Sequence, residues 1–353
     1  MLQRNPTSWQ RPSWQRALAD AVSDVQELLT LLELPPDVNE TSLIAERRFP
    51  LRVPHAYVSR MRKGDPNDPL LRQVLPSTLE ELEIEGYHGD PVGDLNAMPV
   101  PGVLHKYHGR VLLITTGACG IHCRYCFRRH FPYGDANLSA SNMQTALDYI
   151  AADSSITEVI LSGGDPLALP DERLAKLANQ LGAIPHIRRL RIHSRLPIVL
   201  PERIDTSLLA WLKNSHLQKV VVVHANHPNE IDEATAKALR SLQNSDVIVL
   251  NQSVLLRDVN DDTDVLCALS EVLFAAGVLP YYLHLFDKVQ GAAHFDLPEA
   301  MALKLIKNMQ KRLPGYLVPR LVREVANTPA KSPATQDITD TKLPENSDCL
   351  LYF

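Results

Sequence analysis

The sequence has few of the features that mark membrane, secreted or nucleic-acid-binding proteins. Aromatic residues make up only 6% of its 353 positions, and the net charge is −5, so there is no basic excess. No apolar run reaches the ~18 residues of a membrane-spanning helix. The N-terminus lacks the apolar stretch of a secretory signal, and nucleic-acid binding would call for a basic domain. We therefore expect a cytoplasmic protein that acts neither on a membrane nor directly on nucleic acid.

Cysteine is also scarce, but its distribution is uneven. Three of the five cysteines, Cys119, Cys123 and Cys126, fall within eight residues in a C-x3-C-x2-C spacing. Cytoplasmic thiols are mostly reduced. An odd number of cysteines with one tight cluster does not suit a disulfide framework and favours metal binding.

The first 105 residues predict helices joined by loops. Apolar residues at helical spacing predict a helix over 14–34, which Pro35-Pro36 ends. A second helix is expected over about 40–47, and the KGDPNDP segment predicts a turn between two short helices. Residues 85–105 are rich in Gly and Pro. We expect residues 1–105 to form an N-terminal helical region and a linker.

From about residue 107, short aliphatic runs alternate with helical stretches. Strands almost wholly apolar and separated by helices predict a parallel sheet covered on both faces. The expected strands are 111–116, 158–164, 189–194, 220–226, 247–253 and 280–286, with helices near 140–151, 171–183, 205–214, 230–243, 263–276 and 297–312. Six units are fewer than the eight of a closed barrel, so we predict an α/β fold with a partial (β/α)6 barrel over 106–315. Residues 316–353 would form a C-terminal segment. The active site should lie at the C-terminal ends of the strands.

The three-cysteine loop directly follows the first predicted barrel strand. A four-iron cluster usually takes four thiolates, so three thiolates would leave one iron open to a small ligand. Cys267, in a predicted helix, and Cys349, in the tail, are not placed as an obvious fourth ligand. Zinc is the alternative, with His122 and His130 nearby, but zinc sites usually show a second Cys or His pair.

This placement resembles the radical S-adenosylmethionine family. In that family a [4Fe-4S] cluster binds S-adenosylmethionine at its open iron and cleaves it to a 5′-deoxyadenosyl radical. A cofactor is needed because acid–base chemistry cannot break unactivated C–H bonds. The resemblance implies that Cys119, Cys123 and Cys126 bind the cluster. It also implies contacts to S-adenosylmethionine from a glycine-rich turn and two strand ends, at Ser162, Gly163, Gly164, Asp165, His224 and Gln252.

Further segments resemble lysine 2,3-aminomutases over about residues 50–335. They include IHSRLPIVLPERI, NQSVLLRDVND and PYYLHLFDKVQGAAHF. RMRKGDPNDPLLRQVLP and PGVLHKYHGR are similar to the short bacterial form that acts with elongation factor P. These enzymes also carry pyridoxal 5′-phosphate (PLP), which needs a lysine to form its Schiff base. The resemblance places that lysine at Lys331, although the family's run of glycines is missing there, and it implies PLP contacts from Tyr107 and Arg110.

The resemblance also assigns the two ends of the substrate. Arg128 matches the arginine that pairs with the α-carboxylate of lysine, and Asp287 matches a carboxylate that binds the ε-ammonium group. A second carboxylate is Glu324 here, whereas the well-known fermentative enzymes have Asp, so the acceptor is displaced by about one methylene.

The implied product is (R)-β-lysine, made for attachment to elongation factor P by a lysyl-tRNA-synthetase-like ligase. A donor such as flavodoxin would supply the electron. Three other hypotheses stay open: an aminomutase for another amino acid such as glutamate, a radical rRNA methyltransferase, and an electron-transfer or metal-binding module without catalysis. Asp287 favours lysine over an acidic substrate, and a PLP chromophore on Lys331 would exclude the non-catalytic module.

Overall fold

The computed structural model describes residues 12–36, 38, 41–136, 140–326, 328 and 330–334. Over these residues the chain forms one sheet, with strands in the order in which they occur in the sequence. The strands are β1 (Val103–Tyr107), β2 (Arg110–Thr116), β3 (Glu158–Gly163), β4 (Arg189–Ser194), β5 (Gln218–Val223), β6 (Val247–Val254), β7 (Leu279–His284), β8 (Arg320–Arg323) and β9 (Ser332–Pro333).

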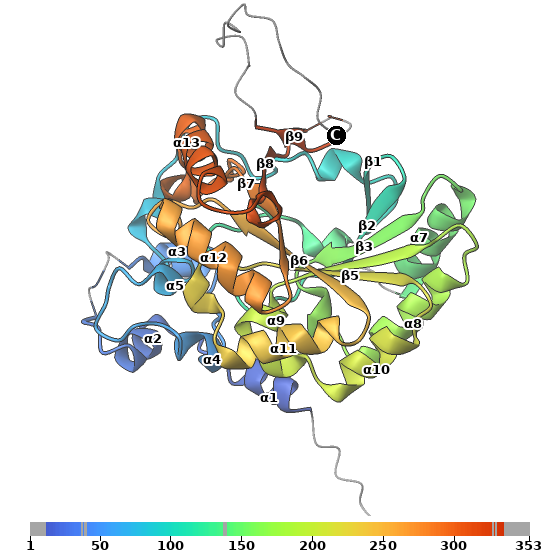
Figure 1. Cartoon of the computed structure of the whole chain (residues 1–353), viewed down its shortest axis with the longest axis horizontal. Coiled ribbons are helices and arrows are strands. Elements are labelled where there is room, and N and C mark those ends of the chain that lie inside the picture. The colour runs from blue at the N-terminus through green and yellow to red at the C-terminus, as the bar shows by residue number, and fades with distance from the viewer. Residues whose placement is uncertain are drawn as a thin grey trace, which may run out of the picture.

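Strands β2 to β8 are parallel, and β1 and β9 pair antiparallel at the two edges. Each parallel crossover carries at least one helix. The helices are α6 (Tyr133–Ala136), α7 (Ala140–Ala152), α8 (Asp171–Gly182), α9 (Leu196–Val199), α10 (Thr206–Asn214), α11 (Glu233–Gln243), α12 (Thr263–Ala275) and α13 (Glu299–Gln310). Figure 1 shows α8, α10, α11 and α12 around the outside of the curved sheet. The α/β partial barrel is therefore confirmed.

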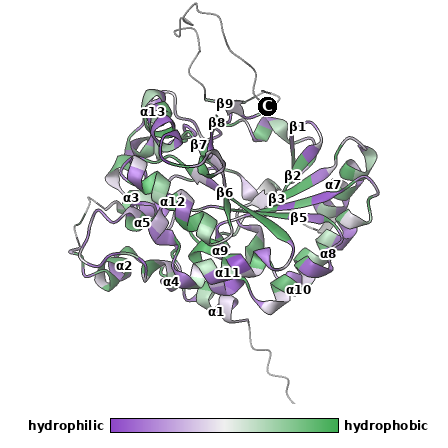
Figure 2. Cartoon of the chain, in the orientation of Figure 1, coloured by the Kyte–Doolittle hydropathy of each residue, from purple (hydrophilic) through white to green (hydrophobic). Residues whose placement is uncertain are grey.

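Three of the outer helices begin where the sequence supplies an aspartate N-cap. The side chains of Asp205, Asp232 and Asp262 each accept a hydrogen bond from a backbone N–H in the first turn of α10, α11 and α12. Such a cap satisfies a donor that the helix itself cannot. In Figure 2 the strands are mainly hydrophobic and the outer helices are mixed, as expected for a sheet buried under amphipathic helices.

The N-terminal region departs from the single helix predicted over 14–34. Two helices, α1 (Ser13–Ala19) and α2 (Val25–Leu31), are separated by a β-bridge between Val22 and Val53. Asp24 then starts a new helix, because its side chain accepts a hydrogen bond from the backbone N–H of Glu27 at 2.8 Å. Helical periodicity continues through the break, so it could not reveal the interruption.

Short helices complete the N-terminal region: α3 (Leu43–Arg48), α4 (His55–Val58) and α5 (Pro69–Arg72). The predicted turn separates α4 from α5. Buried side chains such as Trp14, Leu28 and Tyr57 belong to the same hydrophobic cluster as Val111 and Val159 of the sheet. The proposed boundary at residue 105 falls inside β1, and the division into three parts stays a prediction.

Three strands went unpredicted, and all three border the site. Strand β1 lies in the segment expected to be a linker, while β8 and β9 lie in the C-terminal segment. Each is short or rich in charge, with little apolar alternation to mark it. No helix among the described residues combines the length and apolar character needed to cross a bilayer. The polar tail and Cys349 lie outside the described residues.

Candidate active site

The cysteine loop follows β2 at the C-terminal edge of the sheet. Cys123 and Cys126 are joined by a tight turn, in which the Cys126 N–H donates to the Cys123 carbonyl at 3.0 Å. Arg124, wholly buried between them, donates from Nε to Glu80 Oε1 at 2.8 Å. The backbone N–H of Arg124 also donates to the Gln73 carbonyl at 2.9 Å. The N-terminal region thus fixes the position of the cysteine loop through its contacts with Arg124.

The glycine-rich turn after β3 packs directly on this loop. The Gly164 N–H donates to the Thr116 carbonyl at 2.7 Å, and the Asp165 N–H donates to the Ala118 carbonyl at 2.8 Å. A Cβ on Gly164 would lie 2.5 Å from the Ala118 oxygen, and Gly163 has a φ of +113°. Both positions therefore require glycine. These glycines place the turn against the cysteine loop.

Asp165 is buried and organises the next strand end. One carboxylate oxygen accepts from Ser194 Oγ at 2.7 Å, and the other accepts from the backbone N–H groups of Arg195 and Leu196 at 2.8 and 3.0 Å. Burial raises the pKa of Asp165, although these donors oppose the shift. In the structure Asp165 joins the ends of β3 and β4.

A cavity of about 540 Å³ lies beside the loop and is lined by side chains of β1, β2, β3, β4, β6 and β7, by residues of the loops that follow strands, and by the C-terminal segment. Nine sequence-predicted site residues line it: Tyr107, Arg110, Arg128, Ser162, His224, Gln252, Asp287, Glu324 and Lys331. The three cysteines, Gly163, Gly164 and Asp165 do not line it, and lie on the loop side. The predicted residues therefore divide into two adjoining groups.

Arg128 lies where the two groups meet. Its Nε donates to Asp94 Oδ2 at 2.7 Å, and its Nη1 lies 3.3 Å from Ser162 Oγ. Asp94 also pairs with Lys106 at 2.6 Å. Burial alone would raise the pKa of the Asp94 carboxyl, but Arg128 and Lys106 hold that pKa below its ordinary value. Asp94 is therefore ionised and fixes the arginine's orientation.

Lys331 projects into the cavity from the C-terminal segment. Its Nζ lies 3.1 Å from His284 Nε2 and 3.5 Å from Glu324 Oε2. Burial lowers the pKa of Lys331, although Glu324 and Asp287 oppose the shift. Burial also lowers the pKa of His284, so a neutral imidazole faces the amine. A lysine with a lowered pKa is more often the free amine, the form that attacks a carbonyl.

Asp287 and Glu324, two of the carboxylates that line the cavity, differ in charge state. Burial raises the pKa of Asp287 to about 7, and the nearby Glu324 carboxylate adds to this shift. Burial would also raise the pKa of Glu324, but Lys331 and Lys106 outweigh it and hold that pKa low. Glu324 lies 3.0 Å from Lys106 Nζ. Glu324 is thus ionised and already paired with Lys106. Asp287, in contrast, would become ionised when a cation binds beside it.

The remaining predicted residues sit around the cavity wall. The Arg110 guanidinium stacks 4.7 Å from the centre of the Tyr107 ring, beside the Arg191–Glu158 ion pair. His224 is partly buried, and its Nε2, which is shielded from solvent, has no hydrogen-bond partner among the described residues. Burial lowers the pKa of His224 to about 3, so the ring is neutral and can accept a hydrogen bond.

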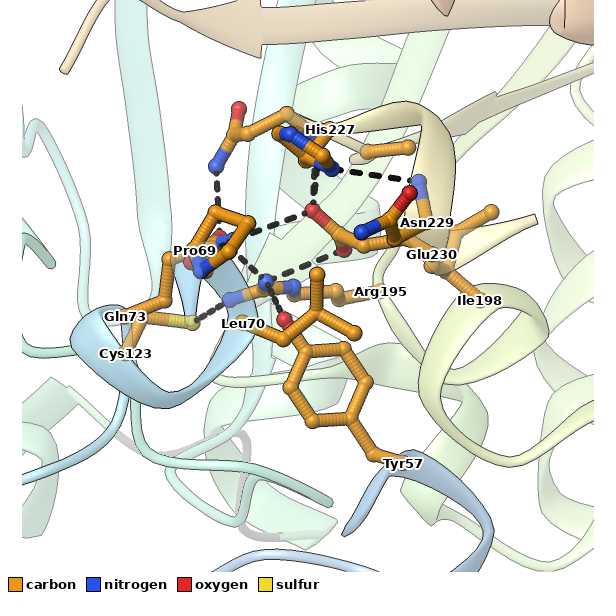
Figure 3. Close-up of polar contacts among 12 residues, drawn as sticks. Tyr57, Pro69, Leu70, Gln73, Cys123, Arg195, Ile198, His227, Asn229 and Glu230 are labelled. Carbon is orange, nitrogen blue, oxygen red and sulfur yellow. Dashed lines mark hydrogen bonds and ion pairs between the residues drawn. The ribbon is translucent and has the colours of Figure 1, made fainter. Parts of the chain in front are cut away.

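A buried network under the loop was missed by the sequence. Arg195 lies at its centre, with Gln73, Cys123 and Glu230 around its guanidinium group (Figure 3). Sequence reasoning also missed Asp94, Lys106 and His284. Of these, only His284 could have been predicted from the sequence, because it is a polar residue at the end of a barrel strand.

Comparisons with known proteins decide the family. Residues 113–266 match the family described as the radical SAM superfamily. The chain is 48% identical to the L-lysine 2,3-aminomutase of Haemophilus influenzae, over 94% of this chain and 98% of that protein. It is 50% identical to the Escherichia coli enzyme of the same name, over 92% and 94%. The chain belongs to the L-lysine 2,3-aminomutase family. It is 35% identical to the Clostridium subterminale member, over 91% of this chain and 77% of that protein.

Membership makes the protein an isomerase of the radical S-adenosylmethionine type, which uses a [4Fe-4S] cluster and S-adenosylmethionine. The loop residues fit the cluster in kind: Cys119, Cys123 and Cys126 are free thiols on one loop, and thiolates are the usual ligands of such clusters. The unpartnered His224 Nε2 beside the loop fits a polar ligand such as S-adenosylmethionine.

Proposed function

We propose that the chain converts L-lysine to (R)-β-lysine with PLP held on Lys331. One observation carries this proposal: a single cavity is lined by Lys331, whose pKa is lowered, together with arginines that include Arg128 and carboxylates that include Asp287. PLP would supply a π-system through which an amino group can migrate between neighbouring carbons. Tyr107 and Arg110 stand at the same cavity, and an arginine fork suits a phosphate group.

The charged residues suit the two ends of lysine. We propose that Arg128, held by Asp94, pairs with the α-carboxylate, and that Asp287 binds the ε-ammonium group. Glu324 would assist at that end once Lys331 carries the cofactor. Fixing both ends of the substrate determines which C–H bond faces the radical. Ser162 bonds to Arg128 at 3.3 Å, which would couple the substrate's carboxylate end to the S-adenosylmethionine side.

The cellular role that we propose rests on the similarity of the sequence to the short bacterial form. In this proposal (R)-β-lysine passes, in the cytoplasm, to a lysyl-tRNA-synthetase-like ligase that modifies elongation factor P. A small electron carrier such as flavodoxin reduces the cluster. The cysteines, Ser162, Gly163, Gly164, Asp165, His224 and Gln252 keep the cluster and S-adenosylmethionine roles assigned above as part of the same proposal.

The test is anaerobic reconstitution with iron, sulfide, PLP and S-adenosylmethionine, followed by chiral analysis of the product from L-lysine. We expect (R)-β-lysine and no reaction with L-glutamate. Lys331→Ala should lose the PLP absorption band and lower the rate by about 10²–10⁴-fold, as loss of a positioned catalytic group does. Lys63→Ala, which removes an exposed lysine paired with Glu33, is the matched control. A PLP band unchanged in Lys331→Ala would refute the assignment.

A further inference from the structure

Arg195 places a buried positive charge against a cluster-binding cysteine. Its Nη1 donates to Cys123 Sγ at 2.6 Å. Its Nη2 donates to Gln73 Oε1 at 2.7 Å, and lies 3.2 Å from both Tyr57 Oη and Glu230 Oε2. The side chain is only 6% exposed, so these contacts are shielded from water. Figure 3 shows the guanidinium between the cysteine and the carboxylate.

Glu230 is the counterion and is itself fully held. It is wholly buried, and its Oε1 accepts from the backbone N–H groups of Asn226 and His227 at 2.9 and 3.1 Å. The amide of Gln73 donates to the same oxygen at 3.2 Å. Glu230 therefore cannot swing away from the arginine, and the distance between the two charges is fixed by the fold.

The network also restrains Arg195 from its other faces. The Tyr57 and Tyr125 rings lie 5.5 and 5.4 Å from the guanidinium carbon. Asp165 accepts from the backbone N–H of Arg195 at 2.8 Å. Tyr57 and Gln73 come from the N-terminal region, Tyr125 from the cysteine loop and Asp165 from the turn after β3. Three separate parts of the chain thus converge on one arginine residue.

We propose that Arg195 and Glu230 together set the reduction potential of the cluster. One-electron reduction changes the cluster core from 2+ to 1+, so it adds one negative charge near Cys123. A buried cation that donates to a ligating sulfur stabilises the reduced form and raises the potential. Glu230 offsets part of that charge and limits the rise. Arg195 is therefore a positioning residue that acts through Cys123, independently of PLP and of the substrate.

The two single variants should move the potential in opposite directions. Arg195→Gln removes the cation and should lower the midpoint potential, whereas Glu230→Gln leaves the cation uncompensated and should raise it. A hydrogen bond to a charged group corresponds to about a tenfold change in the ratio of reduced to oxidised cluster. A tenfold change equals about 59 mV for a one-electron couple. The measurement is a reductive titration of the reconstituted full chain, followed by electron paramagnetic resonance.

Arg203→Gln is the matched control. Arg203 is also wholly buried and pairs with Asp171 at 2.8 Å, and its guanidinium group donates to the backbone carbonyls of Leu167 and Leu169 rather than to a cysteine. It should leave the potential unchanged. Because Arg195→Gln leaves the buried Glu230 carboxylate without its counterion, the double variant Arg195→Gln with Glu230→Gln removes both charges, and its potential should lie between those of the single variants.

Iron content is measured on every variant. Shifts of opposite sign at normal iron content would support the proposal. Equal potentials in all variants, or shifts of the same sign in both single variants, would overturn it. Loss of iron from the single and double variants while Arg203→Gln loads normally would also overturn it, since the network would then be only structural.

Discussion

The cysteine loop and the adjoining cavity share a wall, but their charged groups are held differently. On the loop side, the charged groups are buried and have partners within the protein: Arg124 bonds to Glu80 and to backbone carbonyls, and Arg195 bonds to Glu230. On the cavity side, Asp287 and Lys331 have pKa values shifted toward their neutral forms. Shifts of this kind are typical of functional sites, where a bound ligand can supply the charge that pairs with the ionised side chain.

This difference indicates a division of labour. The loop side is complete within the protein and would receive a cluster whose position is set beforehand. The cavity side is completed by the charges that a cofactor and a substrate bring. Arg128 belongs to both, because it lies two residues after Cys126 in the sequence and also lines the cavity, where it bonds to Ser162 and Asp94. Variants on the two sides should therefore fail in different ways.

The largest effect is expected from Cys126→Ala. Removing one of three thiolates should abolish both cluster iron and β-lysine formation, because S-adenosylmethionine cleavage needs the reduced cluster. Iron analysis and product assay measure the two losses. Cys267→Ala, which changes a buried cysteine in α12, should keep both. Product formation by iron-free Cys126→Ala would contradict the radical scheme.

Gly164→Ala should damage the loop side without removing any ligand. The new Cβ would lie 2.5 Å from the Ala118 oxygen, and backbone on both sides must shift to relieve it. We expect a loss of about 1–3 kcal/mol in the free energy of unfolding, measured by denaturant titration, with a lower iron content. Gly134→Ala is the control, since its Cβ would meet nothing within 4 Å. Equal stability of the two variants would show that the turn does not press on the loop.

The two sides also differ in how well the sequence predicted them. Cys119, Cys123 and Cys126 fall within eight residues and follow a strongly apolar strand, so their spacing alone indicated metal binding there. The predicted cavity residues come from β1, β2, β3 and β6, from the loops after β2, β5, β7 and β8, and from the C-terminal segment. Only resemblance to a family brought them together. Asp94 and Lys106 were missed because they lie in a segment without periodicity, where spacing carries no information on contacts. The six central strands were predicted from apolar runs, whereas β1, β8 and β9 depend on pairing that spacing does not encode.

Asp287 gives the cavity side a pH dependence that the loop side should lack. Burial raises the pKa of Asp287 to about 7, so below that pH the carboxyl is protonated and cannot pair with the ε-ammonium group. The kcat/KM for lysine should fall about tenfold for each pH unit below 7. His224, with a pKa of about 3, does not titrate in this range. Asp287→Asn should lower kcat/KM at pH 8 and remove this limb of the profile; a limb that persists would assign it to another group.

Glu324→Asp is expected to have the smallest effect, and it probes how finely the cavity side is adjusted. The shorter side chain would withdraw its carboxylate by about one methylene from Lys106 and Lys331, which now lie 3.0 and 3.5 Å away. The net charge of the cavity is unchanged, so we expect no more than about a tenfold change in KM for lysine, or 1.4 kcal/mol. Iron content and the cluster's reduction potential should not move, because Glu324 contacts only cavity residues. A shift in that potential would show that the two sides are electrostatically coupled. Arg128, which belongs to both sides, would then be the residue through which the coupling has to be tested.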